Sequence, residues 1–240
     1  MGPLISAHRG SCGVPGLPAA ERYDRAIALG VDYVELDVRR TADGNFVNSH
    51  DDVTPSGRPT SSQPYLELKA ELGSELLTLD EVLDVVAGRV GLHVDLKEPG
   101  DEGDIVRVLL SHPAHARFVV TTGEVESIRA VKELFPDVQA GLTLGADLRN
   151  AHAWVAMSQR LAELFPGPRL ERSHADFVVA HLQLARLRLL RYGRRRRLPV
   201  WVWTVDETSE IARLMGDPRV TTLITNRPDV ALQLRRPKTA

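Results

Sequence analysis

Short apolar segments alternate with helical patterns along the whole chain, and this alternation limits the folds open to it. Eight of these segments are brief and rich in branched apolar residues, as buried parallel strands are. Strands are predicted at 4–8, 33–38, 91–96, 118–122, 139–144, 176–181, 200–205 and 222–225. Because parallel strands need crossover connections and helical patterns separate these eight, the sequence predicts an α/β fold, a (β/α)8 TIM barrel.

Residues that start and stop helices support the segments between these strands. A helix at 18–29 opens with a proline and stops at Gly30, and Thr78-Leu79-Asp80-Glu81 opens a capped helix that runs to Gly88. Further helices are predicted at 122–134, 151–164 and 206–215, each followed closely by a proline or a glycine. The stretch 52–76 is irregular and rich in Ser, Pro and Gly, and we expect it to cover the active face.

Length and composition fit one compact domain over residues 1–240. The chain carries 30 basic and 32 acidic residues, so its net charge of −2 gives no general attraction for nucleic acid or an anionic membrane. A single cysteine, Cys12, excludes an internal disulfide and favours a reducing compartment. No segment reaches the length of a membrane span, and the first residues lack the pattern of a secretion signal. We therefore expect a cytoplasmic protein; its oligomeric state does not follow from the sequence.

Polar residues gather where the first three barrel strands end. Catalytic groups of this fold lie at the carboxyl ends of the strands, and residues two apart on a strand share a face. Six polar residues are expected at these ends: His8, Arg9, Glu35, Asp37, Asp95 and Lys97. Glu35 and Asp37, and likewise Asp95 and Lys97, are two apart and share a face. Three carboxylates without a thiol suit one divalent cation, Mg²⁺ or Ca²⁺, and the two basic side chains would surround a bound anion such as a phosphate.

A hairpin brings a second histidine to the same place. The turn Thr41-Ala42-Asp43-Gly44-Asn45 reverses the chain after the second strand. A turn centred between Asp43 and Gly44 sets His50 opposite Asp37. The returning arm is then a β-hairpin extension at the mouth of the barrel, not a ninth stave.

The chain resembles the glycerophosphodiester phosphodiesterase family through motifs that occur in order over nearly its whole length. They are His8-Arg9-Gly10, Glu35-Leu36-Asp37-Val38, Thr41-x-Asp43-Gly44 leading to His50-Asp51, Leu79-x-Glu81-Val82-Leu83, Asp95-x-Lys97, Trp203-Thr204-Val205-Asp206 and Ile224-Thr225-Asn226-Arg227-Pro228. The resemblance implies a barrel with a hairpin at its mouth, one divalent cation, and hydrolysis of a glycerophosphodiester to glycerol 3-phosphate and an alcohol.

The resemblance also implies a role for each matching residue. His8 and His50 become the acid/base pair, Arg9 and Lys97 contact the phosphate, and the metal ligands are Glu35, Asp37 and Asp95. Trp203 lies nearer the mouth than Trp201, and we expect it to pack against the glycerol or the leaving group.

Two departures from the family pattern stand out. The family's Pro-Glu-Asn-Thr after the first loop is replaced by Gly16-Leu17-Pro18-Ala19, and the third metal ligand, often Glu, is Asp95. Two other functions stay open: a lyase on the same scaffold that releases a cyclic phosphate from a lysophospholipid-type diester, and a barrel that binds phosphorylated ligands without catalysis.

Glu35 and Asp37 could also pair structurally with Arg9 or Arg39. The basic run 194–197 is expected between a helix and the seventh strand, on the amino-terminal face, as solvated surface or a subunit contact.

Overall fold

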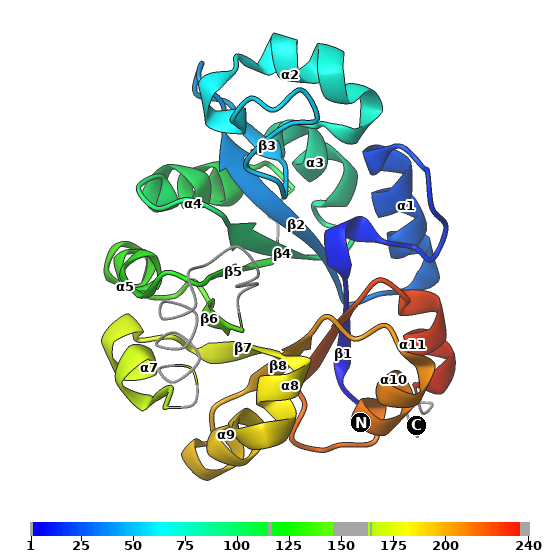
Figure 1. Cartoon of the computed structure of the whole chain (residues 1–240), viewed down its shortest axis with the longest axis vertical. Helices are drawn as coiled ribbons and strands as arrows, with labels where there is room; N and C mark the ends of the chain where they lie inside the picture. The colour runs from blue at the N-terminus through cyan, green and yellow to red at the C-terminus, as the bar shows by residue number, and fades with distance from the viewer. Residues whose placement is uncertain (1, 115–116, 146–162, 164, 236–240) are drawn as a thin grey trace.

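Eight parallel strands close into a barrel in the computed structural model, which describes residues 2–114, 117–145, 163 and 165–235 (Figure 1). Each strand pairs with the next one along the chain, and the first pairs with the last, so the sheet has no free edge. The staves are β1 (Leu4–Ala7), β2 (Tyr33–Arg40), β4 (Gly91–Leu96), β5 (Phe118–Thr122), β6 (Ala140–Leu144), β7 (Phe177–His181), β8 (Val200–Trp203) and β9 (Thr222–Thr225). The predicted TIM barrel is confirmed, and every strand boundary lies within two residues of its prediction.

Helices surround the barrel and bury its outer face (Figure 1). They are α1 (Ala19–Leu29), α3 (Leu79–Val86), α4 (Glu102–Ser111), α5 (Val125–Leu134), α7 (Gly167–Ser173), α8 (Leu182–Leu184), α9 (Leu190–Arg196), α10 (Thr208–Met215) and α11 (Pro228–Leu234). The capping box at Thr78 is confirmed, because its side chain accepts from the Glu81 amide and the Glu81 side chain accepts from the Thr78 amide. In the described parts of the chain, every helix is too short or too polar to cross a lipid bilayer.

Three helix predictions need comment. The helix predicted at 122–134 begins at Val125, because Thr122 is still the last residue of β5. The helix predicted at 206–215 begins at Thr208, because Asp206 instead accepts hydrogen bonds from the loop after β9. The helix predicted at 151–164 falls, apart from Glu163, outside the described residues.

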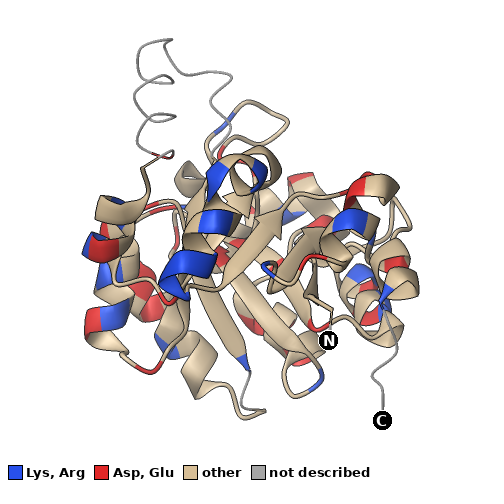
Figure 2. Cartoon of the chain, turned by 90° about the horizontal axis from the view of Figure 1, so that it is seen from below, with Lys and Arg blue, Asp and Glu red and all other residues tan. Residues whose placement is uncertain are grey.

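The basic run lies in the last turn of α9 and just after it, not in a connection beyond the helix (Figure 2). Its four arginines are exposed to solvent. Because the run directly precedes β8, it lies on the amino-terminal side of the barrel, away from the strand ends that carry the polar residues.

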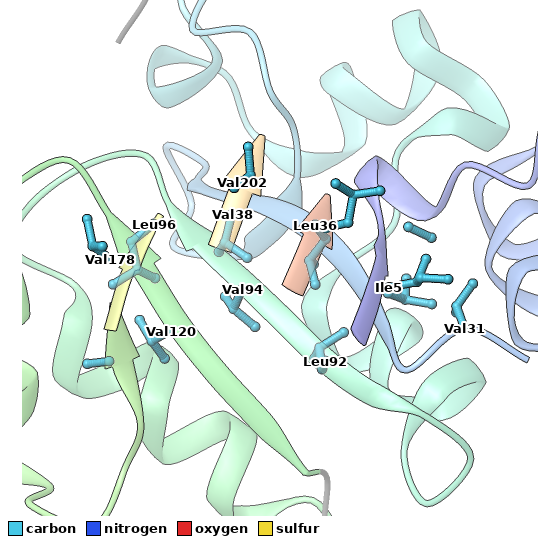
Figure 3. Packing of buried hydrophobic residues seen from close by; sticks show 14 of the residues in the cluster. Ile5, Val31, Leu36, Val38, Leu92, Val94, Leu96, Val120, Val178 and Val202 are labelled. Carbon is cyan, nitrogen blue, oxygen red and sulfur yellow. The ribbon is translucent and has the colours of Figure 1, made fainter. Parts of the chain in front are cut away.

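Strand alternation divides the buried apolar residues into two layers. On β2 and β4 the even-numbered residues Leu36, Val38, Leu92 and Val94 face the helices, where they join the main core (Figure 3). The odd-numbered residues point into the barrel. They supply an inner layer at its amino-terminal end and the polar groups above that layer.

An aromatic plug fills the lower barrel interior. The Trp201 ring lies 4.7 Å from Phe177 and 5.2 Å from Tyr33, measured between ring centroids. Two glycines make room for these rings, since a Cβ at Gly141 would lie 2.2 Å from Phe177 and one at Gly91 would lie 2.6 Å from Tyr33. Trp201 is therefore a core residue.

The hairpin register differs from its prediction by one residue. Arg40 pairs with Phe46 and Val38 with Asn48, so Ser49, and not His50, faces Asp37. The difference arises because the loop holds three residues, with Gly44 in the left-handed region at φ 86°, rather than a two-residue turn. His50 follows β3 (Phe46–Asn48) in an irregular segment.

The segment 52–76 is more ordered than its composition indicates. It contains the helix α2 (Tyr65–Leu72), which lies beside the hairpin in Figure 1. A separate small core, made of Val47, Leu68 and Leu76 with Tyr65 and Leu72 packed against it, fastens this segment to β3. The segment therefore forms, with the hairpin, one unit added to the barrel.

This small core gives a prediction about local stability. Leu68→Ala should lower the free energy of opening this unit by about 2–5 kcal/mol, because Leu68 is fully buried there. Hydrogen exchange of the α2 amides should then be at least about 20-fold faster. Leu66→Ala on the exposed face of the same helix is the control and should leave exchange nearly unchanged. Equal exchange in the two variants would contradict the proposed anchoring.

Candidate active site

The first motif forms a sharp turn directly after β1. His8, Arg9 and Gly10 make one 3₁₀ turn, in which Arg9 (φ 50°) and Gly10 (φ 65°) adopt left-handed backbone conformations. A Cβ at Gly10 would lie 2.0 Å from the Tyr23 ring, so only glycine fits there. The strained Arg9 backbone aims its N–H at Glu35, whose Oε2 accepts at 2.6 Å.

The pleat of β2 points Glu35 and Asp37 into the barrel mouth, where they are 3% and 4% exposed. Asp37 Oδ1 lies 2.6 Å from the Lys97 ammonium, and its Oδ2 lies 3.2 Å from Arg9 Nε. The contact with Arg9 Nε is an ion pair without hydrogen-bond geometry, so Oδ2 is buried without a hydrogen bond. Of the two structural pairings considered, Arg9 does pair with Asp37, whereas Arg39 pairs with Glu98.

Lys97 joins Asp37 to Asp95. Its Nζ lies 2.6 Å from an oxygen of each carboxylate. The second oxygen of Asp95 accepts a 2.6 Å hydrogen bond from Thr121 Oγ1. Both Asp95 oxygens are thus engaged by groups other than Glu35.

The polar chain continues downward from Thr121 to the aromatic plug. Thr121 Oγ1 lies 2.9 Å from His93 Nε2, and His93 Nδ1 lies 3.3 Å from Ser6 Oγ. The His93 ring also stands edge-on to Trp201, with centroids 5.1 Å apart. Burial lowers the pKa of His93 to about 4, so this ring is neutral around pH 7.

Burial and charge act in opposite directions on the two β2 carboxyls. Burial raises the pKa of Glu35 well above its usual value, and the nearby Asp37 and Asp95 raise it further. Burial also opposes ionisation of Asp37, but the Lys97 ammonium and Arg9 outweigh it and hold the pKa of Asp37 below normal. Lys97 is buried too, yet Asp95 and Asp37 raise its pKa and keep it charged.

The two predicted acid/base histidines reach the site from different parts of the fold. His8 is half-buried on the turn after β1, and burial lowers its pKa despite a 2.9 Å contact from Nδ1 to Asn226 Oδ1. His50 is exposed on the hairpin unit, with Nδ1 2.7 Å from Asp51 Oδ1. The Arg39 guanidinium donates to the His50 carbonyl and fixes its backbone.

Two adjoining clefts open between these histidines. One, of about 260 Å³, is lined by Asp37, His50 and residues of the hairpin unit; the other, of about 470 Å³, is lined by His8, Asn226 and the loop after Gly10. Both clefts include Arg9, Arg22 and Glu75 in their walls. Arg9 therefore stands where the two clefts meet, with its side chain 44% exposed.

The carboxylates partly fit a hard cation. Glu35 and Asp37 lie on one strand face, and the buried Asp37 Oδ2 has no hydrogen bond, so a cation would supply the missing partner. Within residues 2–114, 117–145, 163 and 165–235, no three His, Cys, Asp or Glu side chains are grouped to hold a metal ion. With Lys97 placed between Asp37 and Asp95, the participation of Asp95 stays a prediction.

Trp203 is placed away from the two clefts. Its indole Nε1 donates to the Leu144 carbonyl at 3.3 Å, and its ring packs edge-on against His181 at 5.7 Å. Trp203 is not among the residues that line either cleft. Its contact with a substrate therefore stays a prediction.

The sequence interpretation gave no role to several residues that shape the site. Asn226 contacts His8, and Asp206 accepts a hydrogen bond from Asn226. Asn48, on β3, donates a hydrogen bond to Tyr23, and Thr121 donates one to Asp95. Asn226 and Asp206 belong to the last two matching motifs, so their motifs were a usable signal. Thr121 and Asn48 carry no such signal.

Comparison with known proteins agrees with this geometry. Residues 8–230 match the model of the glycerophosphoryl diester phosphodiesterase family, so the chain belongs to that family. A glycerophosphodiester phosphodiesterase of Caldanaerobacter subterraneus is 26% identical over 98% of this chain and 99% of its own length. The predicted family is confirmed, and it places the chain among the phosphoric diester hydrolases.

Solved structures show the same fold. A glycerophosphodiester phosphodiesterase from Thermotoga maritima has a TM-score of 0.74, with 20% identity over 98% of both chains. An Oleispira antarctica phosphodiesterase, solved in complex with the product sn-glycerol-3-phosphate, has a TM-score of 0.76 and 22% identity over 97% of this chain and 96% of that one.

The buried His93 predicts a pH dependence of stability. Its pKa is depressed to about 4 in the folded protein from 6.5 when unfolded, so its contribution to stability is complete above pH 6.5 and is lost as the pH falls toward 4. The loss amounts to about 3 kcal/mol. Urea unfolding from pH 7 to pH 4 should show a weaker pH dependence for His93→Asn than for the parent. The same change at the exposed His174 is the control; if His93→Asn keeps the parental slope, His93 is not the group responsible.

Proposed function

We propose that this protein hydrolyses glycerophosphodiesters to glycerol 3-phosphate and an alcohol, with a divalent cation and with His8 and His50 as the acid/base pair. The observation that carries the proposal is that His8, His50, Arg9 and Asp37 line two adjoining clefts. The buried Lys97 ammonium pairs with Asp37, and Glu35 lies on the same face of β2 as Asp37. The names of the relatives, and the glycerol phosphate product in the Oleispira structure, support this choice of substrate.

Arg9 is the group best placed to receive the phosphate. Its guanidinium is partly exposed where the two clefts meet, and a guanidinium can donate two parallel hydrogen bonds to phosphate oxygens. A phosphodiester centred there can send one ester arm into each cleft. Lys97 lies deeper and adds positive charge that opposes the buried carboxylates.

The two histidines differ in what holds them. His8 is neutral near pH 7 because burial lowers its pKa, so it can accept a proton from the attacking hydroxyl or water. The His50 ring is oriented by the Asp51 carboxylate, which leaves Nε2 to exchange a proton with the other ester oxygen. Hydrolysis needs one group that takes a proton from the nucleophile and one that gives a proton to the leaving oxygen. His8 lines one cleft and His50 lines the other, so each can serve one of these steps.

Glu35 and Asp37, with Asp95, are the residues that would hold the cation. All their donor atoms are oxygens, which suits Mg²⁺ or Ca²⁺. When bound, such an ion supplies positive charge that stabilises the non-bridging phosphate oxygens. It would also favour the ionised form of Glu35, whose pKa is raised by burial and by its acidic neighbours.

A panel of glycerophosphodiesters, assayed with and without Mg²⁺ and Ca²⁺, tests the function. We expect glycerol 3-phosphate as the product, formed only with a cation present. Accumulation of a cyclic phosphate as the end product would instead identify a lyase. Binding without turnover across the panel would identify a phosphate-binding barrel.

The histidine pair gives the third prediction. His8→Ala and His50→Ala should each lower kcat by about 10²–10⁴-fold and leave binding of glycerol 3-phosphate nearly unchanged, because each removes a proton carrier but no phosphate contact. Steady-state kinetics and product titration measure both effects. His174→Ala, at an exposed position before β7, is the control. A histidine whose removal leaves the parental rate has no part in the reaction.

The cation gives the fourth prediction. Activity should vanish in excess EDTA and return with Mg²⁺ or Ca²⁺, and Asp37→Asn should resemble chelation. Asp95→Ala should raise the half-saturating metal concentration, whereas Asp95→Glu should be tolerated far better and Lys97→Ala should mainly weaken phosphate binding. Metal titrations of activity for these variants separate the cases. If Asp95→Ala leaves the half-saturating concentration unchanged, only Glu35 and Asp37 bind the ion.

A further inference from the structure

A second group of polar side chains, separate from Glu35, Asp37 and Asp95, contacts His8. His8 Nδ1 lies 2.9 Å from Asn226 Oδ1, and Asn226 Nδ2 lies 2.8 Å from Asp206 Oδ2. Asn226 follows β9, and Asp206 lies between β8 and α10. The three groups thus come from three separate parts of the chain and form two consecutive side-chain hydrogen bonds.

Asn226 is held at its backbone as well as its side chain. Its N–H donates to Asp206 Oδ1 at 2.8 Å, and its carbonyl accepts from Ser11 Oγ at 2.7 Å. Thr225 Oγ1 also donates to Asp206 Oδ1. Two loops and the turn after β1 are therefore joined around this one amide.

The donor and acceptor groups of Asp206, Asn226 and His8 fix the direction of each hydrogen bond. An ionised carboxylate only accepts, so the Asn226 NH₂ group must face Asp206 and the amide oxygen must face His8. An amide oxygen also only accepts, so His8 Nδ1 must carry the proton. The unprotonated nitrogen of neutral His8 is then Nε2.

We propose that Asp206 and Asn226 are positioning residues that hold His8 in the Nδ1–H tautomer, with Nε2 as the nitrogen that takes the proton in the reaction. This inference rests on the proposed acid/base role of His8. Neither residue touches the phosphate in this arrangement; both act through the imidazole. The carboxylate fixes the amide, and the amide fixes both the ring orientation and the tautomer.

The tautomer can be read directly, without any assay of activity. Nitrogen-15 NMR of histidine-labelled protein distinguishes a protonated ring nitrogen from an unprotonated one, and the spectrum of His8→Ala identifies the His8 signals. At a pH where His8 is neutral, the parent should show a protonated Nδ1 and an unprotonated Nε2. A protonated Nε2 in the parent overturns the proposal.

Variants test whether the hydrogen bonds from Asp206 through Asn226 to His8 cause the Nδ1–H tautomer. Asn226→Ala removes the acceptor and should leave a mixture of tautomers, with kcat about 10–10²-fold lower and KM little changed. Asn226→Asp sets two carboxylates against each other and should impair turnover as well. The double variant Asn226→Asp with Asp206→Asn restores an amide–carboxylate pair with an acceptor toward His8, and it should recover the parental tautomer and most of kcat.

Asp217→Asn is the matched control, because Asp217 binds Arg219 at the far end of α10 and has no contact with His8. It should leave kcat and the His8 signals unchanged. The proposed positioning role is wrong if Asn226→Ala keeps a pure Nδ1–H ring. It is also wrong if the double variant remains folded but does not recover the Nδ1–H tautomer. In both cases the phosphodiesterase activity would still stand. If His8→Ala keeps the parental rate, the proposed role of His8 fails instead.

Discussion

Two carboxylates buried at the mouth of a barrel must be matched by positive charge, and the arrangement of the site follows from that requirement. Asp37 receives Lys97 and Arg9, and the Lys97 ammonium is shared with Asp95. Glu35 accepts a hydrogen bond from the Arg9 backbone N–H, and its pKa is raised by burial and by its acidic neighbours. A site left short of positive charge in this way attracts a cation and, through the exposed guanidinium, an anion beside it.

The lower part of the barrel interior holds residues that stabilise the fold, and the upper part holds the residues of the candidate active site. The aromatic plug of Tyr33, Phe177 and Trp201 closes the lower interior by packing of its rings. His93 and Thr121 form the layer between this plug and the carboxylates, so hydrogen bonds replace apolar packing gradually and not at one abrupt boundary. Changes in the plug should alter folding, whereas changes above Thr121 should alter the reaction.

The fold and most site positions could be predicted because they depend on local pattern. Strand alternation alone directs Glu35 and Asp37 into the barrel, and the structure places them there. The hairpin register could not be predicted, because a three-residue loop with Gly44 in the left-handed region shifts it by one residue. The placement of Lys97 between two carboxylates, the helix inside 52–76 and the contact of Asn226 with His8 all depend on residues distant in sequence, for which one sequence gives no pairing signal.

The two histidines are carried by parts of the molecule with different cores. His8 follows a stave of the closed barrel, whereas His50 follows β3, whose unit packs around Val47, Leu68 and Leu76. A small core opens more readily than a large one, because it buries less apolar surface for each ordered residue. On heating, we therefore expect the protein to lose one of its two proton carriers while the barrel is still intact, so that inactivation precedes melting and is reversed on cooling.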